Sequence, residues 1–308
     1  MKKLLIFITL LGVFSLSYSQ KNEPFSSLFN GKDLNHWTMP GEVPGFKVVD
    51  GIIIAEPQNA SNLYTKEQFG NFILKFEFLL SKVGNSGVLI RCDPQHPWET
   101  GVEIQLLAPW TPYRDDLHCT GSIYGHVAVT NRPDETTGKW HQMEIKCDRK
   151  NITISVNGEV TTLADIDTVE SMNDKHLFGA IGLQSNHGEE GEYVHLRNIS
   201  IRNFDTEPEY VMEGFYADDA RLIKQAYEAA VLIGAPMIKP LSRMMAEVHP
   251  KSQAGAKQVL FDIVAQSTAP GASDSEKMAV KKALQSSLKE SEIVSEYLDK
   301  LLKMVKSK

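Results

Sequence analysis

The hydrophobic period of this sequence changes once, near Pro208, and that change constrains the fold more than any other feature. Before it, apolar and polar residues alternate, as in residues 72–80, which is the period of a β-strand with one buried face. After it, apolar residues recur every three or four positions, as in residues 293–305, which is the period of an amphipathic helix. We therefore expect a mainly β part over residues 20–207, followed by an all-α part over residues 208–308.

Turn signals refine the β part. Asp50-Gly51 and Asn157-Gly158 each separate two apolar runs and predict two-residue hairpin turns. Within residues 194–201 the apolar positions change parity, which predicts a β-bulge near Arg197-Asn198. Many short strands joined by Gly- and Asn-rich turns favour a β-sandwich or jelly roll.

The helical part carries about five apolar stripes, and its length of roughly a hundred residues suits a small helical bundle or a short HEAT-like solenoid. Its methionines stand at helical spacing and are interpreted as core residues. No residue beyond Pro208 suggests chemistry, so we expect this part to pack or to dock a protein partner.

The first 19 residues have the pattern of a signal peptide. Lys2 and Lys3 precede an apolar run over residues 4–14, and Ser17-Tyr18-Ser19 offers small residues for cleavage before Gln20. No cysteine follows the apolar run, so a lipoprotein anchor is not expected. The sequence predicts a periplasmic or secreted protein without a membrane span after cleavage; an uncleaved anchor is the alternative.

Charge and cysteine content exclude several classes. The net charge of −7 over 308 residues leaves no basic surface for nucleic acid, and we expect no nucleotide cofactor. Cys92, Cys119 and Cys147 show no CxxC spacing, which argues against a zinc ribbon or a thioredoxin motif. One disulfide, Cys92 with Cys119, and three buried thiols remain as alternatives.

Polar side chains gather on three segments of the β part. Strand alternation puts Asn85 and Arg91 on one face, and it puts Glu103 and Gln105 on a shared face while their apolar neighbours point into the core. A third strand ends in Gln184, and His187 follows it in a loop. We expect a carboxylate, amides, a guanidinium and an imidazole to converge on one sheet face.

Aromatic residues and histidines flank these segments. Trp98 and Trp110 lie in predicted loops on either side of the second polar strand, where they either stack on sugar rings or cap the sandwich edge. His118 and His126 flank a Gly-containing segment with Tyr124, and they are either acid–base groups or ligands, or structural residues.

At these positions the sequence resembles the 3-keto-disaccharide hydrolase family. The resemblance covers residues 25–204 and excludes the helical part. Its ordered motifs are Leu28-Phe29-Asn30-Gly31-Lys32-Asp33-Leu34, Asn85-Ser86-Gly87, Val102-Glu103-Ile104-Gln105-Leu106, Thr120-Gly121-Ser122-Ile123-Tyr124-Gly125, Ile181-Gly182-Leu183-Gln184 and Leu196-Arg197-Asn198-Ile199.

The resemblance implies a concanavalin-like jelly roll that acts on glucosides oxidised at C3. A C3 ketone acidifies the C2 hydrogen, so a base removes it, the C1 substituent leaves, and water can then add. Glu103, His187 and His118 become the expected base, acid or ligands, with Glu103 and His187 as ligands of a divalent cation acting as a Lewis acid. The expected substrate-binding residues are Asn85, Arg91, Gln105, Tyr124, Gln184, Trp98 and Trp110.

Three positions depart from the family pattern. Ala108-Pro109 stands where the family often has Asp-Asn, and His195 stands where it usually has Glu. The family often has Gln-Asp-His-Gly or Gln-His-Gly where this sequence has Gln184-Ser185-Asn186-His187-Gly188. These departures leave two further hypotheses open. One is a non-catalytic carbohydrate-binding module on the same scaffold, and the other is an interaction protein whose helices dock a partner.

Overall fold

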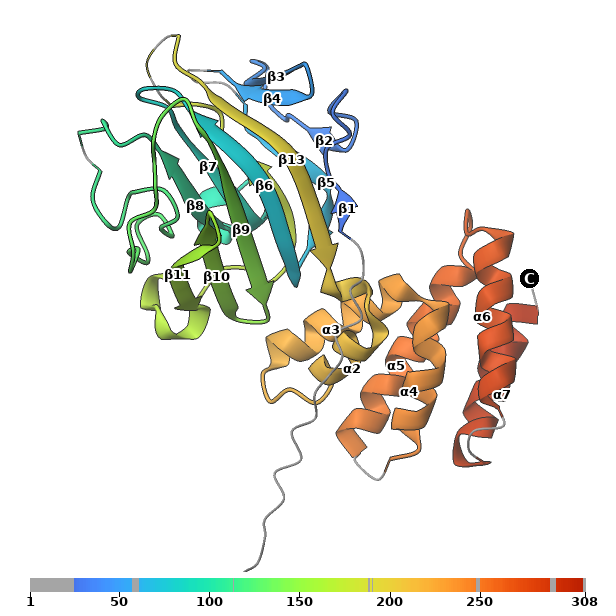
Figure 1. Cartoon of the computed structure of the whole chain (residues 1–308). Helices are drawn as coiled ribbons and strands as arrows, with labels where there is room; N and C mark the ends of the chain where they lie inside the picture. Colours follow the sequence, from blue (N-terminus) through green and yellow to red (C-terminus); the bar gives the residue numbers. More distant parts are fainter. Residues whose placement is uncertain are drawn as a thin grey trace, which may run out of the picture.

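The computed structural model describes a β-sandwich followed by helices (Figure 1). The predicted signal peptide, residues 1–19, lies outside the described residues. The described residues are 25–306, except 57–60, 113, 188, 190, 248–249 and 289–291. Within them, no helix is both long enough and apolar enough to cross a bilayer.

The larger sheet of the sandwich has eight antiparallel strands in the order β11-β10-β9-β6-β13-β4-β3, with β1 also paired to β13. Its central strands, β6, β9 and β13, face the viewer in Figure 1. The bounds are β1 (Ser26–Ser27), β3 (Phe46–Val49), β4 (Ile52–Ala55), β6 (Phe72–Leu80), β9 (Trp140–Asp148), β10 (Asn151–Val156), β11 (Glu159–Asp165) and β13 (Val194–Asn203).

The smaller sheet has five strands in the order β2-β5-β12-β7-β8 and lies behind the larger one in Figure 1. Its strands pair antiparallel throughout. The bounds are β2 (Trp37–Thr38), β5 (Leu63–Phe69), β12 (Gly179–Leu183), β7 (Asn85–Cys92) and β8 (Val102–Leu107).

The inner faces of the two sheets form one apolar core, as the period-two alternation predicts. In β6, Phe72, Leu74, Phe76, Phe78 and Leu80 are all buried, while the residues between them are more exposed. Each such side chain contributes roughly 1.5–3 kcal/mol when it is withdrawn from water. The expected mainly β sandwich of jelly-roll type is therefore confirmed.

The predicted turns and the predicted bulge are present. Asp50 and Asn157 adopt positive φ of 49° and 52°, each followed by a glycine with positive φ, as a two-residue hairpin turn requires. In β13 the register against β6 shifts between Arg197 and Ser200, and Asn198 has a φ of 54°. This bulge reconciles the two parities of β13 with one buried face.

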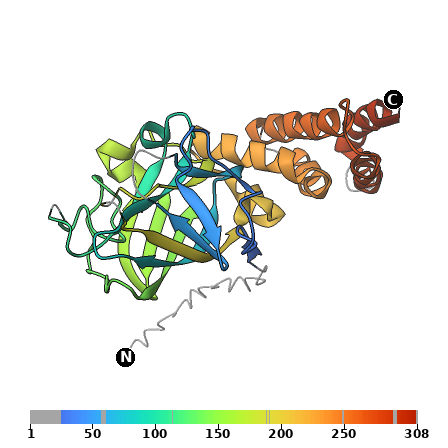
Figure 2. The same cartoon turned by 90° about the horizontal axis from the view of Figure 1, so that it is seen from above.

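Six α-helices follow the sandwich among the described residues, one more than the five apolar stripes because a short helix precedes them. Helix α2 packs on α3, α4 on α5 and α6 on α7, and these pairs form a row that leads away from the sandwich (Figures 1 and 2). They are α2 (Pro208–Gly214), α3 (Ala220–Ile233), α4 (Ile238–Met245), α5 (Pro250–Ser267), α6 (Asp274–Ser287) and α7 (Glu292–Lys306).

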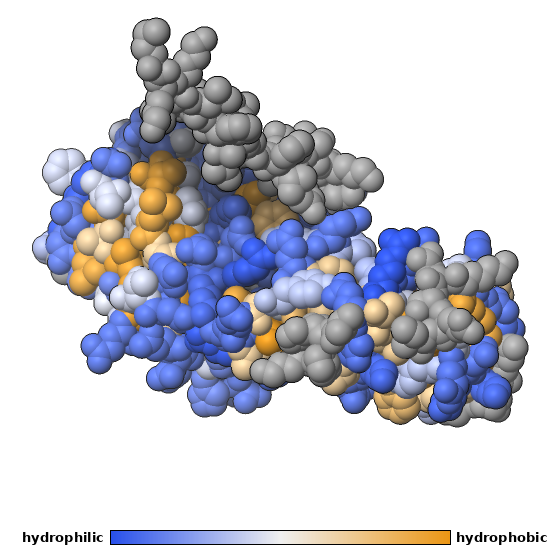
Figure 3. All heavy atoms as spheres, turned by 90° about the horizontal axis from the view of Figure 1, so that it is seen from below, coloured by the Kyte–Doolittle hydropathy of each residue, from blue (hydrophilic) through white to orange (hydrophobic). Residues whose placement is uncertain are grey.

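Exposed apolar side chains are found on several elements of the described part of the chain. Seen from below, the surface is mostly hydrophilic, with separate apolar patches on the sandwich and on the helical part (Figure 3). Leu163 on β11, Leu232 on α3 and Met278 on α6 are each more than half exposed. The protein partner expected for the helices therefore stays a prediction.

The cysteines are three free, buried thiols in the structure. The alternative pairing of Cys92 with Cys119 does not form. Cys92 lies on β7 and Cys119 lies in the loop after β8, and both side chains are fully buried.

Asp205 fixes the point where the chain leaves the sandwich for the helices. Its carboxylate accepts hydrogen bonds from the backbone N–H groups of Gly70 and Asn71 at 2.8 and 2.9 Å, and from the Asn71 side chain at 2.7 Å. Asp205 is only 7% exposed, so these bonds are shielded from water. The turn between β5 and β6 is thereby tied to the residues that begin the helical part.

We expect Asp205→Ala to lower the free energy of unfolding by roughly 2–4 kcal/mol, because it leaves two buried backbone donors and one amide without an acceptor. Urea denaturation followed by circular dichroism measures this loss. Asp205→Asn, which keeps one acceptor oxygen, should lose less. Equal loss in both variants would contradict the proposed role of the carboxylate.

Candidate functional site

The outer face of the five-stranded sheet carries the predicted polar residues. In the β7–β8 pair, Leu89 lies opposite Glu103, Gly87 opposite Gln105 and Asn85 opposite Leu107. Since Ile104 and Val88 belong to the core, these paired positions must point away from it. The structure thus brings Glu103, Gln105 and Asn85 together on one face.

Gly87 makes room for the carboxylate of Glu103. A Cβ on Gly87 would collide with the Glu103 side chain, including its Oε1, Cδ and Cγ atoms. The glycine of the Asn85-Ser86-Gly87 motif is therefore required by a close approach rather than by its backbone conformation. The Glu103 side chain lies across this gap and is only 8% exposed.

Two side chains donate hydrogen bonds to the Glu103 carboxylate. Trp98 Nε1, from α1 (Pro97–Thr100), donates to Oε2 at 3.2 Å, and the Gln184 side chain forms a second bond. Burial raises the pKa of Glu103 to about 7, and the two hydrogen bonds oppose this rise. A carboxyl group with this pKa exchanges a proton readily near neutral pH.

Amide side chains continue the polar face along β7 and β12. Gln105 Nε2 donates to Asn85 Oδ1 at 2.8 Å, and Gln184 follows β12 at the level of Gly87. His187 lies next to Asn85, because its backbone N–H donates to the Asn85 carbonyl oxygen at 2.7 Å, and its side chain is exposed. The structure places Gln184 at the carboxylate and His187 at the Asn85 end of the face.

The long loop after β8 pairs with the edge of this strand and so widens the same face. Ile123 bridges to Ile104, so Tyr124 and Ser122 stand beside Glu103 and Gln105 respectively. The Tyr124 backbone N–H donates to the Glu103 carbonyl oxygen at 2.9 Å, and its side chain is 39% exposed. The loop therefore extends the sheet beyond β8 and forms part of the rim of the site.

His118 lies on this rim beside Tyr124. The two rings meet edge to face with centroids 4.8 Å apart, and His118 Nδ1 lies 2.7 Å from Asp115 Oδ1. The hydrogen bond to His118 lowers the pKa of Asp115, which keeps that carboxylate charged and able to orient the imidazole. This histidine–carboxylate pair is the arrangement of an oriented acid or base. His126 does not join it: its Nδ1 lies 2.7 Å from Ser171 Oγ.

Arg91 does not lie on this face, contrary to the expectation from strand alternation. Ala180 pairs with Cys92 and Gly182 with Leu89, so two β7 residues oppose one β12 residue in a bulge, and Arg91 has a φ of 55°. The bulge turns its side chain into the protein, where it is fully buried and its Nε donates to the Gly70 carbonyl oxygen at 2.7 Å. A role for Arg91 in substrate binding is therefore not carried forward.

The two tryptophans have different positions. Trp98 contacts Glu103 and is 50% exposed, so one side of its ring faces the solvent at the rim. Trp110 lies in the turn after β8 and is 68% exposed, and no described contact joins it to Glu103. The structure unites Trp98 with the site and leaves Trp110 apart from it.

The residues present do not form a cation site. Across the part of the chain that the structure describes, no three His, Cys, Asp or Glu side chains converge as metal ligands would. The Glu103 carboxylate instead forms hydrogen bonds with the Trp98 indole and the Gln184 amide. These two groups are not the set of oxygen ligands that a divalent cation requires. The pair expected as ligands, Glu103 and His187, lacks a third ligand among the described residues.

Two residues of the site were not predicted from the sequence. Ser122 is fully buried, and its Oγ has no hydrogen-bond partner among the described residues, although it stands beside Gln105. Asp115 orients His118. The spacing of Asp115 and His118, three residues apart in one loop, was the available signal for the second residue.

Fold and site together define a jelly roll with an amide-lined carboxylate on one sheet face, and comparison with known proteins gives the family. Residues 24–202 match the model of the 3-keto-alpha-glucoside-1,2-lyase-like domain. The match spans more than half of the chain, so the protein belongs to this family. No curated protein matches the sequence.

Solved structures of similar fold come from Parabacteroides distasonis ATCC 8503. One proposed glycosyl hydrolase is 27% identical, with a TM-score of 0.51 over 59% of this chain and 100% of that one. A second is 25% identical, with a TM-score of 0.51 over 58% of this chain and 93% of that one. The family and these structures support a glycoside-acting protein.

We expect Glu103→Gln to be more stable than the wild type at pH 8 and equally stable at pH 4. The pKa of Glu103 is raised, so between pH 4.5 and about 7 the folded state retains a proton that the unfolded state loses. Wild-type stability therefore falls as pH rises through this window, by roughly 3 kcal/mol in total. Urea titrations at the two pH values measure the difference, and a difference that does not grow with pH would contradict the buried carboxyl.

Proposed function

We propose that this protein cleaves glucosides whose C3 hydroxyl has been oxidised to a ketone, and that Glu103 is the base. The observation that supports this is a carboxyl group on an amide-lined face, 8% exposed, whose pKa is raised by burial to about 7. A base for an acidified C–H needs a pKa close to the working pH. The family match over residues 24–202 supports the 3-keto substrate.

The proposed reaction begins with the transfer of the C2 hydrogen as a proton to the Glu103 carboxylate. The C2–H electron pair moves into the C2–C3 bond, and the C3 carbonyl becomes an enolate. Collapse of the enolate restores the ketone, forms a C1–C2 double bond and breaks the bond between C1 and its oxygen substituent. Addition of water across the double bond gives net hydrolysis. One base and one acid suffice, unlike the carboxylate pair of ordinary glycosidases.

His118 is the proposed acid. Asp115 holds its imidazole through a hydrogen bond of 2.7 Å, and Tyr124 packs against its ring at the rim of the site. When protonated, His118 gives its proton to the departing C1 oxygen, so the leaving group departs as an alcohol rather than an alkoxide. His187, on the other side of the face near Asn85, is the alternative acid.

The amides and aromatic groups around Glu103 hold the sugar in this proposal. Gln105, Asn85 and Gln184 offer donors and acceptors for hydroxyl and enolate oxygens. The half-exposed ring of Trp98 and the exposed side chain of Tyr124 offer apolar surfaces for the sugar ring. The described side chains that touch Glu103 bring no Lys or Arg, so an uncharged glycoside suits the site best.

The mature protein should release 4-nitrophenol from a 4-nitrophenyl 3-keto-glucoside and none from the unoxidised glucoside. Both anomers should be tested, with mass spectrometry to distinguish elimination from hydrolysis. We expect Glu103→Gln to lower the rate at least about a hundredfold, because the base is lost. Saturable binding without release would instead identify a carbohydrate-binding module. Activity that disappears with a chelator and returns with a divalent cation would contradict the metal-free mechanism.

The dependence of kcat/KM on pH should report Glu103. Because the base must be ionised and the acid must be protonated, kcat/KM should follow a bell-shaped profile whose rising side passes through pH about 7. Trp98→Phe removes a hydrogen bond that lowers the pKa of Glu103, so it should move the rise of kcat/KM to higher pH. If kcat/KM rises at the same pH in Trp98→Phe as in the wild type, a group other than Glu103 is responsible for the rise.

A further inference from the structure

Side chains of helix α3 form hydrogen bonds with a segment of the sandwich that lies between β11 and β12. This bracing segment comprises residues 166–177. Gln225 Nε2 donates to the carbonyl oxygen of Leu177 at 2.7 Å, and Arg221 Nη1 donates to that of Asn173 at 3.3 Å. Gln225 is 7% exposed, so its bond is protected from competing water.

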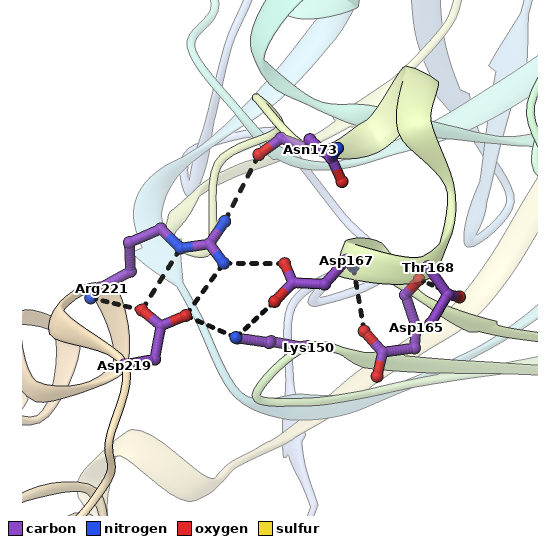
Figure 4. Close-up of polar contacts among 7 residues, drawn as sticks. All are labelled: Lys150, Asp165, Asp167, Thr168, Asn173, Asp219 and Arg221. Atoms are coloured by element: carbon purple, nitrogen blue, oxygen red, sulfur yellow. Dashed lines mark hydrogen bonds and ion pairs between the residues drawn. The ribbon is translucent and has the colours of Figure 1, made fainter.

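A cluster of four charges reinforces these hydrogen bonds (Figure 4). Asp167 of the bracing segment and Asp219, the N-cap of α3, point toward the same two cations, Lys150 and Arg221. Arg221 Nη2 lies 2.7 Å from Asp167 Oδ1 and 3.0 Å from Asp219 Oδ2. Isolated ion pairs at this exposure contribute little, but here each cation bridges both carboxylates and thereby joins helix to sandwich.

The bracing segment holds α1 from its other side. The Nζ of Lys175 donates to the carbonyl oxygens of Trp98 and Glu99, and the backbone N–H of His176 donates to that of Thr100 at 2.7 Å. These bonds reach three consecutive residues of α1. Because α1 has only four residues and no side-chain N-cap, contacts from outside must fix its position.

We infer that α3 is a positioning element of the candidate site: through the bracing segment it holds α1, and with it the Trp98 indole, against Glu103. The connection runs from Gln225 and Arg221 through the chain of residues 173–177 to α1, with hydrogen bonds at both ends of that segment. The helical part, which lies outside the family match, thus supports the reaction without touching the substrate. The inference rests on the proposed function for its kinetic test only.

The full-length Gln225→Ala and Arg221→Ala variants test the inference. Loss of the hydrogen bonds of either residue should make α1 more mobile. Quenching of Trp98 fluorescence by acrylamide should then rise about twofold, and kcat/KM on the 3-keto-glucoside should fall about fivefold. Trp98 is one of four tryptophans, so its signal is the difference between each variant and the same variant carrying Trp98→Phe. Arg221 is exposed, which keeps one of the two variants free of core damage.

Glu213→Ala is the matched control. It removes another ion pair between a helix and the sandwich, from Arg149 Nη2 to Glu213 Oε2 at 2.8 Å, that does not touch the bracing segment. This control should leave quenching and kcat/KM unchanged. In the Trp98→Phe background, Gln225→Ala should cause no further loss of kcat/KM.

Two results would overturn the inference. One is Trp98 quenching that stays at the wild-type value in both bracing variants, and the other is a full additional loss of kcat/KM in the Trp98→Phe background. If the wild type does not cleave the 3-keto-glucoside, the proposed function fails, whereas the quenching comparison still decides whether α3 positions Trp98.

Discussion

Burial on both faces of the five-stranded sheet is the constraint from which the rest of the structure follows. Its inner face packs into the apolar core, and on its outer face Glu103, Gln105 and Gln184 are buried as well. Most polar side chains there find hydrogen-bond partners among one another, as Glu103 does with Trp98 and Gln105 with Asn85, whereas the Ser122 hydroxyl has none among the described residues. A carboxyl group in such surroundings resists ionisation, so the same burial that completes the fold sets the chemistry of the site.

The parts of the fold that depend on local periodicity were predictable from the sequence. Alternation in residues 72–80, the two hairpin turns and the parity change in β13 each follow from side-chain direction and turn geometry over a few residues. Glu103 and Gln105 were correctly placed on one face for the same reason, because no irregularity interrupts β8. Helix α2, the one helix beyond the five predicted, was missed because its seven residues are too few to show a period.

The remaining part of the site depends on irregular backbone, which alternation cannot predict. A single extra residue in β7 reverses the side chain of Arg91 and removes it from the face that regular alternation assigns to it. Ser122, Tyr124 and Asp115 reach the site because a long loop folds back beside β8, and no pattern within that loop indicates this pairing. The helical part likewise meets the sandwich through single residues, such as Gln225, whose partner Leu177 lies 48 positions earlier in the sequence.

The three free, buried thiols can report local opening of the protein in three different places. Cys92 lies in the smaller sheet, Cys147 in the larger one and Cys119 in the loop after β8. Burial raises the pKa of all three, to about 12 for Cys92 and about 11 for Cys147. Each is inert while its own layer is closed, because only an exposed thiolate reacts. The order in which an alkylating reagent modifies the three cysteines would therefore show which part opens first. Modification of Cys119 would report opening of the loop after β8.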